Sequence, residues 1–238
     1  MDNVSPALSE ITSPTGSATL PEAVLWDMDG TIIDTEPQWS AAEMEVARRY
    51  GATWDHEASE ELIGLALPDS IQIFKRVTGI DVSGDQLIAD IISCMVMYVR
   101  DGLPAWRPGV RELLGRLREY SIPCALVTMS YQDLADVVIE KLPPGTFQEV
   151  ITGDQVRRGK PHPEPYLVAA QRLGVDIKKT VALEDSVAGV TSAAAAGAWT
   201  IGVPAHQDLP PSDSYTIMSS LENVEPHDLL PLARQRGG

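Results

Sequence analysis

Short apolar runs alternate with segments of helical periodicity along most of the chain. The apolar runs are typical of buried parallel strands and occupy residues 23–27, 123–128, 148–152, 180–183 and 198–202. Apolar residues at helical spacing lie between or after them, at 108–117, 131–142, 163–174 and 186–196. Because strands and helices alternate, the sequence predicts a doubly wound, Rossmann-like α/β core with a mostly parallel sheet.

The interval between the first and second predicted strands is too long for an ordinary crossover. It has helical periodicity at about 37–50, 57–63, 68–78 and 84–101, which predicts an inserted α-helical cap at residues 35–104. The insertion leaves the core just after Asp34, at the carboxyl end of the first strand. Ligands bind at that edge of open α/β sheets, so the cap is placed to act as a lid.

The remaining chain divides into a tail and a core. Residues 1–20 are rich in Ser, Thr, Pro and Ala and are expected to be disordered, whereas 21–34 and 105–238 form the predicted catalytic core. No apolar run approaches the roughly 18 to 20 residues that a bilayer requires, and the N-terminus does not resemble a signal peptide. We therefore expect a cytoplasmic protein, with a monomer as the default.

Charge and cysteine content narrow the function further. The net charge of -16 argues against nucleic acid or an anionic membrane as a partner, because both require a basic surface. An anionic substrate would need local help from a metal ion, a lysine or helix N-termini. Cys94 and Cys124 lie in hydrophobic segments without metal-ligand spacing, so they are expected to be buried thiols.

Polar residues gather where the predicted strands end. Asp27 and Asp29 follow the first strand, and period-2 alternation would aim both toward the same side before Gly30 turns the chain. Two carboxylates so close repel one another unless a cation lies between them or one retains a proton. Further groups follow other strands or precede a helix: Thr128, Met129, Ser130, Lys160, Glu184 and Asp185. A nucleophile, a second acid, a hydroxyl, a cation and an acidic pair together suit phosphoryl transfer.

Each of these residues also has a structural interpretation. An Asp-x-Asp-Gly segment after a strand is often a solvated turn. Thr128, or better Ser130, would cap the helix that follows. Glu184 and Asp185 would be first-turn acids favoured by the dipole of the helix at 186–196, and Lys160 would be a surface charge. Each structural interpretation is reasonable for one residue alone. It is a poor explanation for polar groups that recur at the ends of several strands and before a helix.

Four ordered motifs resemble those of the haloacid dehalogenase superfamily. They are DMDGT at 27–31, the hydrophobic-TMS stretch at 126–130, GKPHPEPY at 159–166 and LEDSVAGV at 183–190. The chain is most similar to the branch with a helical cap after the first motif, close to the β-phosphoglucomutase-like sugar phosphatases. The resemblance spans residues 23 to about 205 and implies a hydrolase with an α/β core.

The resemblance also implies a role for each motif residue. Asp27 would attack phosphorus and form an aspartyl-phosphate, while Asp29 would protonate the departing alcohol and then take a proton from water. Mg²⁺ would bind the Asp27 carboxylate, the Asp29 backbone carbonyl and Asp185, with assistance from Glu184. Thr128, the backbone N–H of Met129 and Lys160 would hold the phosphate.

Related activities are separated by residues that this chain lacks. β-Phosphoglucomutases carry a histidine after the first motif, and a lysine and an arginine around a cap glycine, to hold a second phosphate. Those places correspond to Trp39, Ile63 and Leu67, around Gly64, so no cation is offered to a bisphosphate. The candidate substrate contacts in the cap are Trp39, Gly64, Leu65 and Leu67. We therefore expect a Mg²⁺-dependent phosphatase for a small sugar or polyol phosphate; the alternatives are a phosphosugar mutase and a non-catalytic binding protein.

Overall fold

The computed structural model describes residues 20–63, 65–102 and 105–235 and contains one main sheet. Its strands run in the order β5-β4-β1-β6-β7-β8, and each neighbouring pair is parallel. They are β1 (Ala23–Trp26), β4 (Cys124–Val127), β5 (Glu149–Ile151), β6 (Thr180–Glu184), β7 (Trp199–Gly202) and β8 (Thr216–Ile217). The predicted doubly wound parallel sheet is confirmed. Only the edge strand β8 was not predicted, because two residues carry no readable periodicity.

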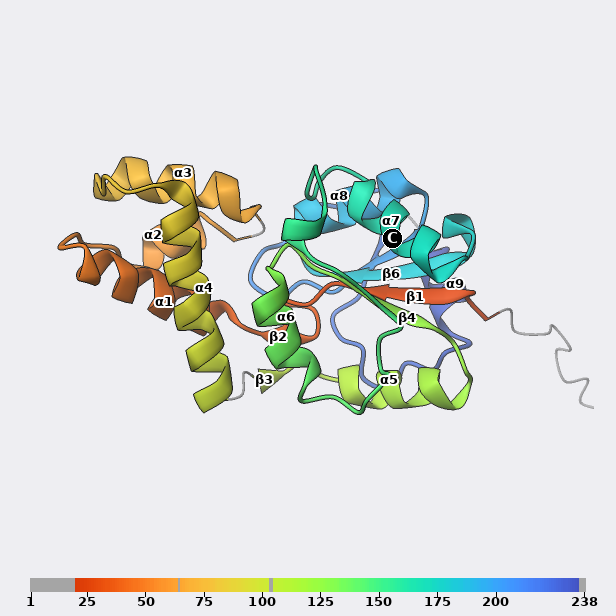
Figure 1. Cartoon of the computed structure of the whole chain (residues 1–238). Helices are drawn as coiled ribbons and strands as arrows, with labels where there is room; N and C mark the ends of the chain where they lie inside the picture. Colours follow the sequence, from red (N-terminus) through yellow and green to blue (C-terminus); the bar gives the residue numbers. More distant parts are fainter. Residues whose placement is uncertain (1–19, 64, 103–104, 236–238) are drawn as a thin grey trace, which may run out of the picture.

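Helices cover both faces of this sheet (Figure 1). They are α5 (Val110–Glu119), α6 (Gln132–Ile139), α7 (Glu164–Leu173), α8 (Val187–Ala196) and α9 (Leu229–Ala233), with short 3-10 turns η1 (Gly153–Gln155) and η2 (Ile177–Lys179). Alternate side chains of β1 divide between two buried clusters: Val24 and Trp26 pack with residues of α5, α6 and α9, while Leu25 packs with residues of α7 and α8. Burial on both faces explains why the strands are continuously apolar.

Chain order defines a switch point at the centre of the sheet. From β1 the chain continues to β4 and β5 on one side, and later returns through β6, β7 and β8 on the other. The connections that leave the neighbouring strands β1 and β6 therefore run in opposite directions along the sheet. In open α/β sheets the crevice beyond such strands, at their carboxyl ends, is the expected ligand site.

In the described residues between β2 (Ile33–Asp34) and β3 (Ala105–Trp106), four helices form a separate layer, which we call the cap (Figure 1). They are α1 (Glu36–Arg49), α2 (His56–Glu60), α3 (Leu67–Thr78) and α4 (Gly84–Asp101). β2 and β3 pair antiparallel, so the chain enters and leaves the cap side by side. The side chains of Asp55 and Ser83 accept hydrogen bonds at the N-termini of α2 and α4, as short polar residues do at helix starts.

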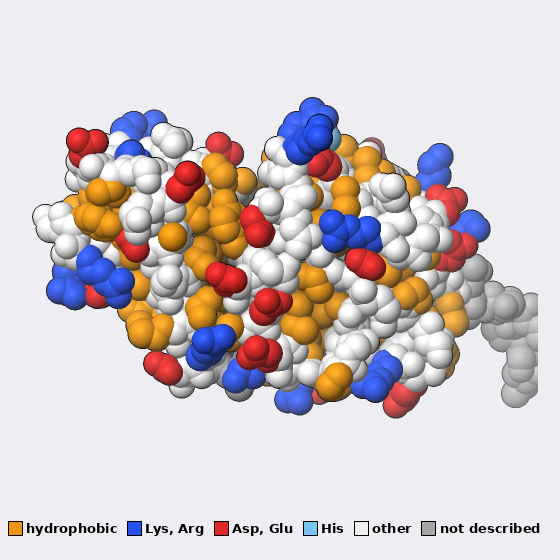
Figure 2. Space-filling view, in the orientation of Figure 1, with side chains coloured by type: hydrophobic (Ala, Val, Ile, Leu, Met, Phe, Trp, Pro, Cys, Tyr) orange, Lys and Arg blue, Asp and Glu red, His pale blue; other side chains and the backbone are white. Residues whose placement is uncertain are grey.

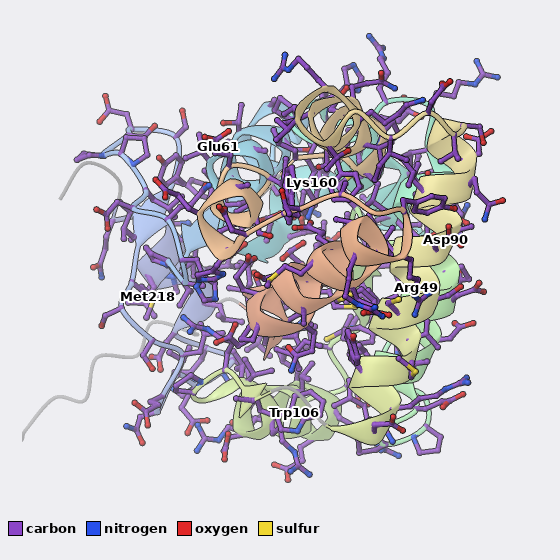
Figure 3. All side chains as sticks on the ribbon, turned by 90° about the vertical axis from the view of Figure 1, so that its left-hand side faces the viewer. Arg49, Glu61, Asp90, Trp106, Lys160 and Met218 are labelled. Atoms are coloured by element: carbon purple, nitrogen blue, oxygen red, sulfur yellow. The ribbon has the colours of Figure 1, made fainter. Side chains whose placement is uncertain are left out.

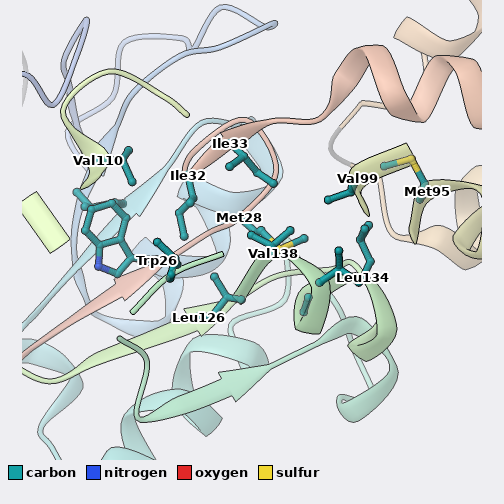
Figure 4. Packing of buried hydrophobic residues seen from close by; sticks show 14 of the residues in the cluster. Trp26, Met28, Ile32, Ile33, Met95, Val99, Val110, Leu126, Leu134 and Val138 are labelled. Atoms are coloured by element: carbon teal, nitrogen blue, oxygen red, sulfur yellow. The ribbon is translucent and has the colours of Figure 1, made fainter. Parts of the chain in front are cut away.

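The cap rests on the core through helix α4, which packs against α6. Met95 and Val99 of α4 belong to the same buried cluster as Leu134 and Val138 of α6 and Met28 beyond β1 (Figure 4). On the surface above this contact, acidic side chains gather along the junction of cap and core (Figure 2). No helix in the described parts of the chain has the length and apolar character to cross a membrane. Cys94 and Cys124 are free and buried, as predicted.

Candidate active site

Three carboxyl groups meet at the switch point of the sheet. β1 and β6 pair in a register that sets Trp26 beside Leu183, so the residues that follow, Asp27 and Glu184, become neighbours. One oxygen atom each from Asp27, Glu184 and Asp185 lies within 4.8 Å of the others, and all three residues are buried. Parallel pairing therefore brings together acids that are more than 150 positions apart in the sequence.

Lys160 inserts a single positive charge among these acids. Its Nζ lies 2.6 Å from Asp27 Oδ1 and 2.6 Å from Glu184 Oε1, and it donates a 2.8 Å hydrogen bond to the carbonyl of Val127. The side chain is 3% exposed, and from the cap side it lies toward the middle of the molecule (Figure 3). Lys160 is therefore not a surface charge. One ammonium beside three carboxylates leaves negative charge unbalanced, as a cation site requires.

Burial and mutual repulsion change the proton affinity of the acids. Burial raises the pKa of Asp27 to about 7, with further contributions from Glu184 and Asp29, although Lys160 opposes the rise. The pKa of Asp185 is raised well above its ordinary value by burial and by the charges of Asp27 and Glu184. These buried carboxyl groups resist ionisation because too little positive charge lies beside them. A hard divalent cation, which prefers oxygen ligands, would supply that charge.

Glu184 is fixed by contacts on both of its oxygens. The hydroxyl of the fully buried Tyr166 donates a 2.5 Å hydrogen bond to Oε1. Oε2 lies against the first turn of α8, where a Cβ atom on Gly189 would come within 1.8 Å of it. Ser186, not an acid, caps this helix by accepting a hydrogen bond from the Gly189 N–H. The interpretation of Glu184 and Asp185 as first-turn residues of this helix is therefore wrong, because α8 begins at Val187 and has no acid in its first turn.

Gly30 allows the turn after β1 to approach the same acids. Its φ is +80°, a left-handed conformation that favours glycine. A Cβ atom at this position would lie 2.0 Å from Asp185 Oδ2. The DMDGT motif thus needs glycine at this place for backbone geometry and for close approach of Asp185.

Asp29 is held apart from the acidic triad by four donors. Thr35 Oγ1 and Trp39 Nε1 donate to Oδ1 at 2.6 and 3.2 Å, while Ser130 Oγ and Thr128 Oγ1 donate to Oδ2 at 2.7 and 3.3 Å. Two of the donors come from the segment that enters the cap, and two from the loop after β4. The carboxyl group is therefore fixed in one orientation from both sides of the site.

Ser130 and Thr128 do not act as the capping residues of the following helix. Helix α6 begins after Tyr131 and has no side-chain hydrogen bond at its N-cap. The hydroxyl of Ser130 points instead to Asp29, and Thr128 Oγ1 accepts a 3.0 Å hydrogen bond from the backbone N–H of Ser130. The preference for Ser130 as a cap was wrong because the sequence does not show how close Asp29 comes.

A cavity of about 120 Å³ lies between these groups and the cap. Its walls include most of the site residues expected from the sequence: Asp27, Asp29, Trp39, Leu65, Leu67, Thr128, Met129, Lys160 and Asp185. Leu67 is buried and Leu65 is exposed to solvent as well. Glu184 lies behind the wall and is fully buried, while Gly64 falls outside the described residues. The cavity thus joins the core acids to the cap.

The cap side of this cavity is more polar than expected from Leu65 and Leu67, the leucines predicted to contact the substrate. It contains carboxyl and hydroxyl groups that the sequence analysis did not select: Thr35, Glu36, Glu43, Ser59 and Ser70. A signal for Glu43 was present, because Glu36, Trp39 and Glu43 are spaced three and four residues apart and share one face of α1. Ser59 and Ser70 carried no such signal, since their helices reach the cavity only through tertiary packing.

Ionisation of Glu43 is expected to make folding stability depend on pH. Burial raises the pKa of Glu43 from 4.5 to about 7, and hydrogen bonds from Ser59 and Trp54 oppose the rise. Between these values the unfolded chain binds fewer protons at this residue than the folded protein, so the free energy of unfolding falls as pH rises. A shift of this size corresponds to a loss of about 3 kcal/mol.

The glutamine in Glu43→Gln is neutral at every pH, so the free energy of unfolding of this variant should not fall as the pH rises. Between pH 5 and 8 the difference in this free energy between the variant and the wild type should grow by up to about 3 kcal/mol in favour of the variant, as measured by urea unfolding. Glu45→Gln is the matched control on the same helix. The side chain of Glu45 is 25% exposed, and hydrogen bonds from Arg48 and Arg49 lower its pKa to about 2, outside this range. Its curve should run parallel to that of the wild type, and a parallel curve for Glu43→Gln would contradict the expectation.

The core is of the α/β class, with a parallel sheet that carries acids and a lysine at its switch point. A helical insertion covers this site. The model of the haloacid dehalogenase-like hydrolase family matches residues 24–203, and the chain belongs to this family. It is 33% identical over 177 residues to a phosphorylated carbohydrates phosphatase of Thermotoga maritima, covering 74% of this chain and 82% of that protein. It is 31% identical to hexitol phosphatase B of Escherichia coli, covering 77% and 83%.

The fold is shared with solved structures. CbbY from Rhodobacter sphaeroides in complex with phosphate superposes with a TM-score of 0.78 at 27% identity, covering 86% of this chain and 96% of that one. The predicted membership of the haloacid dehalogenase superfamily is therefore confirmed.

Proposed function

We propose that this protein is a Mg²⁺-dependent phosphomonoester hydrolase that acts on a small sugar or polyol phosphate. The observation that carries the proposal is the contact of Lys160 with Asp27 inside a buried acidic triad, with Asp29 fixed at the same cavity. The phosphatase names of the two relatives support the reaction and the substrate class. This geometry supports the role that we propose for each residue.

In the proposed reaction an oxygen of Asp27 attacks phosphorus, and the ester bond to the alcohol breaks as an aspartyl-phosphate forms. Asp29 gives a proton to the departing alcohol oxygen, then accepts one from the water that hydrolyses the aspartyl-phosphate. Thr128, the backbone N–H of Met129 and Lys160 bind the phosphate oxygens. Trp39 and Thr35 keep Asp29 in position through the hydrogen bonds described above.

The acidic triad would hold the Mg²⁺ ion. Asp27 and Asp185 would bind it through their carboxylates and Asp29 through its backbone carbonyl, with Glu184 orienting the site from its buried position. When bound, the ion supplies positive charge that offsets repulsion between the acids and the phosphate. Lys160 contributes the second positive charge through its contact with Asp27.

Hydrolysis is favoured over a mutase reaction by the charges around the cavity. Among its described lining residues, the basic side chains are those of Lys160 and His206. Lys160 is engaged by the acids, and His206 Nε2 lies 2.8 Å from Asp34 Oδ1. Glu36 and Glu43 line the cap side, where they would repel a second phosphate. A bisphosphate intermediate therefore finds no counter-charge among the described cap residues that line the cavity.

Phosphate release from a panel of sugar, polyol, nucleotide and glycolate phosphates tests the proposal. We expect turnover of a sugar or polyol monophosphate that is lost with EDTA and restored by Mg²⁺. Interconversion of β-glucose 1-phosphate and glucose 6-phosphate without net phosphate release would establish the mutase instead. The absence of turnover together with the absence of beryllium fluoride binding would favour a non-catalytic binding protein. A cytoplasmic monomer remains a prediction that gel filtration and fractionation can test.

A further inference from the structure

Glu43 is a buried carboxyl group held at the cap side of the cavity. The residue is 6% exposed and lines the cavity together with Asp27 and Asp29. Trp54 Nε1 donates to Glu43 Oε2 at 3.1 Å and to Ser59 Oγ at 2.8 Å. The indole ring of Trp54 is itself packed against Phe74, with ring centroids 4.7 Å apart. Glu43 and Ser59 are therefore presented to the cavity by a rigid support.

No ion pair among the described residues accounts for an acid at this place. No lysine or arginine among the described residues forms an ion pair with Glu43, and the charged group that acts on it is another acid, Glu36. A buried carboxyl group without a counter-ion costs folding free energy, so apolar packing alone would be better served by leucine. Unpaired acids that line cavities are characteristic of ligand sites.

The chemistry of this wall matches hydroxyl groups better than other ligands. A carboxyl group that ionises near neutral pH can donate or accept a hydrogen bond, as a substrate hydroxyl also can. Ser59 and Ser70 add hydroxyl groups of their own along the same wall. A second phosphate or a carboxylate would be repelled by Glu36 and Glu43, whereas a neutral polyol chain would not.

Resting on the phosphatase activity proposed above, we infer that Glu43 and Ser59 bind hydroxyl groups of the alcohol part of the substrate. These two residues would then set a preference for hydroxylated esters over plain alkyl esters of equal length. In the proposed reaction the phosphate binds beside the core acids, so this pair would act on specificity and not on the chemical step. An alkyl ester would bind less well, because it would leave the buried polar groups of Glu43 and Ser59 without hydrogen-bond partners.

The test compares sorbitol 6-phosphate with n-hexyl phosphate, which differ in hydroxyl groups but share chain length. In Glu43→Ala we expect the ratio of the two kcat/KM values, sorbitol ester over hexyl ester, to fall on the order of 10- to 100-fold. Glu43→Gln keeps a donor and an acceptor and should lose less than Glu43→Ala. Glu45 pairs with Arg48 and Arg49 and is not among the residues that line the cavity, so Glu45→Gln should leave the ratio at its wild-type value.

Several outcomes separate failure of this inference from failure of the phosphatase proposal. If the wild type releases phosphate from neither a panel ester nor these two, the phosphatase proposal fails first. If folded Glu43→Ala loses activity equally on both esters, the specificity role is overturned while the activity stands. Should Glu43→Ala not fold by circular dichroism, Glu43→Gln and Ser59→Ala take its place, and an unchanged ratio in both overturns the inference.

Discussion

Asp27→Asn is expected to reduce phosphate release by roughly 10³-fold or more, to the background rate of the assay. An amide is not a nucleophile at phosphorus, and it offers no negative charge to a divalent cation. Lys160 would keep its contact with Glu184, 2.6 Å away, so the buried ammonium would remain paired and the fold should persist. Initial rates at saturating substrate and Mg²⁺, with the melting temperature measured in parallel, check this result.

Asp213→Asn serves as the matched control, because Asp213 is an exposed aspartate of the same core. The control should retain wild-type turnover. A folded Asp27→Asn protein with activity close to the wild type would reject Asp27 as the nucleophile. Trapping experiments add a second readout: acid-stable phosphate incorporated from a substrate labelled on phosphorus should appear in the wild type and not in Asp27→Asn.

Asp29→Ala is expected to lower kcat by on the order of 10² to 10⁴-fold, the range typical for loss of general acid–base catalysis. Asp27 would still be able to attack, since Asp29 lies outside the acidic triad and contacts neither Lys160 nor Glu184 in the hydrogen bonds described. The deficit should therefore be smaller for an ester with a good leaving group, such as p-nitrophenyl phosphate. Comparing that ester with a sugar phosphate measures this difference.

Ser130→Ala is a milder change at the same site, and its kcat can be compared with that of Asp29→Ala. It removes one of the hydrogen bonds to Asp29, the 2.7 Å contact to Oδ2, and leaves the carboxyl group in place. Its loss should be smaller, about 10-fold, because Thr35 and Trp39 still orient the acid. An Asp29→Ala protein that hydrolyses alkyl and aryl esters within about threefold of the wild type would remove Asp29 from the proton-transfer role.

Local patterns predicted most of the core and the motif residues. The apolar runs at 23–27 and 180–183 became β1 and β6, within one residue at each end. The helical periodicity at 68–78 and 84–101 became α3 and α4 with similar accuracy. These segments are readable because each side chain's burial follows the period of its own element. The short strands β2, β3 and β8 have two residues each and no period to read.

The hydrogen bonds of the site were less readable. Ser130 resembled a helix cap because its local sequence fits one, yet its hydroxyl meets an acid 101 positions earlier in the chain. Glu43 was not selected, because the spacing that sets it on one face of α1 with Glu36 and Trp39 does not show that this face lines a cavity. Its partners, Trp54 and Ser59, come from the following turn and helix. Contacts of this kind depend on how elements pack, which periodicity does not specify.

The sequence by itself determined the class of fold and indicated the inserted cap and the candidate reacting residues, because each depends on local period or on short motifs. Only the tertiary structure decided which acids share one buried volume, how Asp29 is oriented and that the cap presents a carboxyl group to the cavity. The physical reason is that charge repulsion, burial and hydrogen bonding act across space. Residues such as Asp27 and Asp185 acquire their properties from neighbours that only folding brings near.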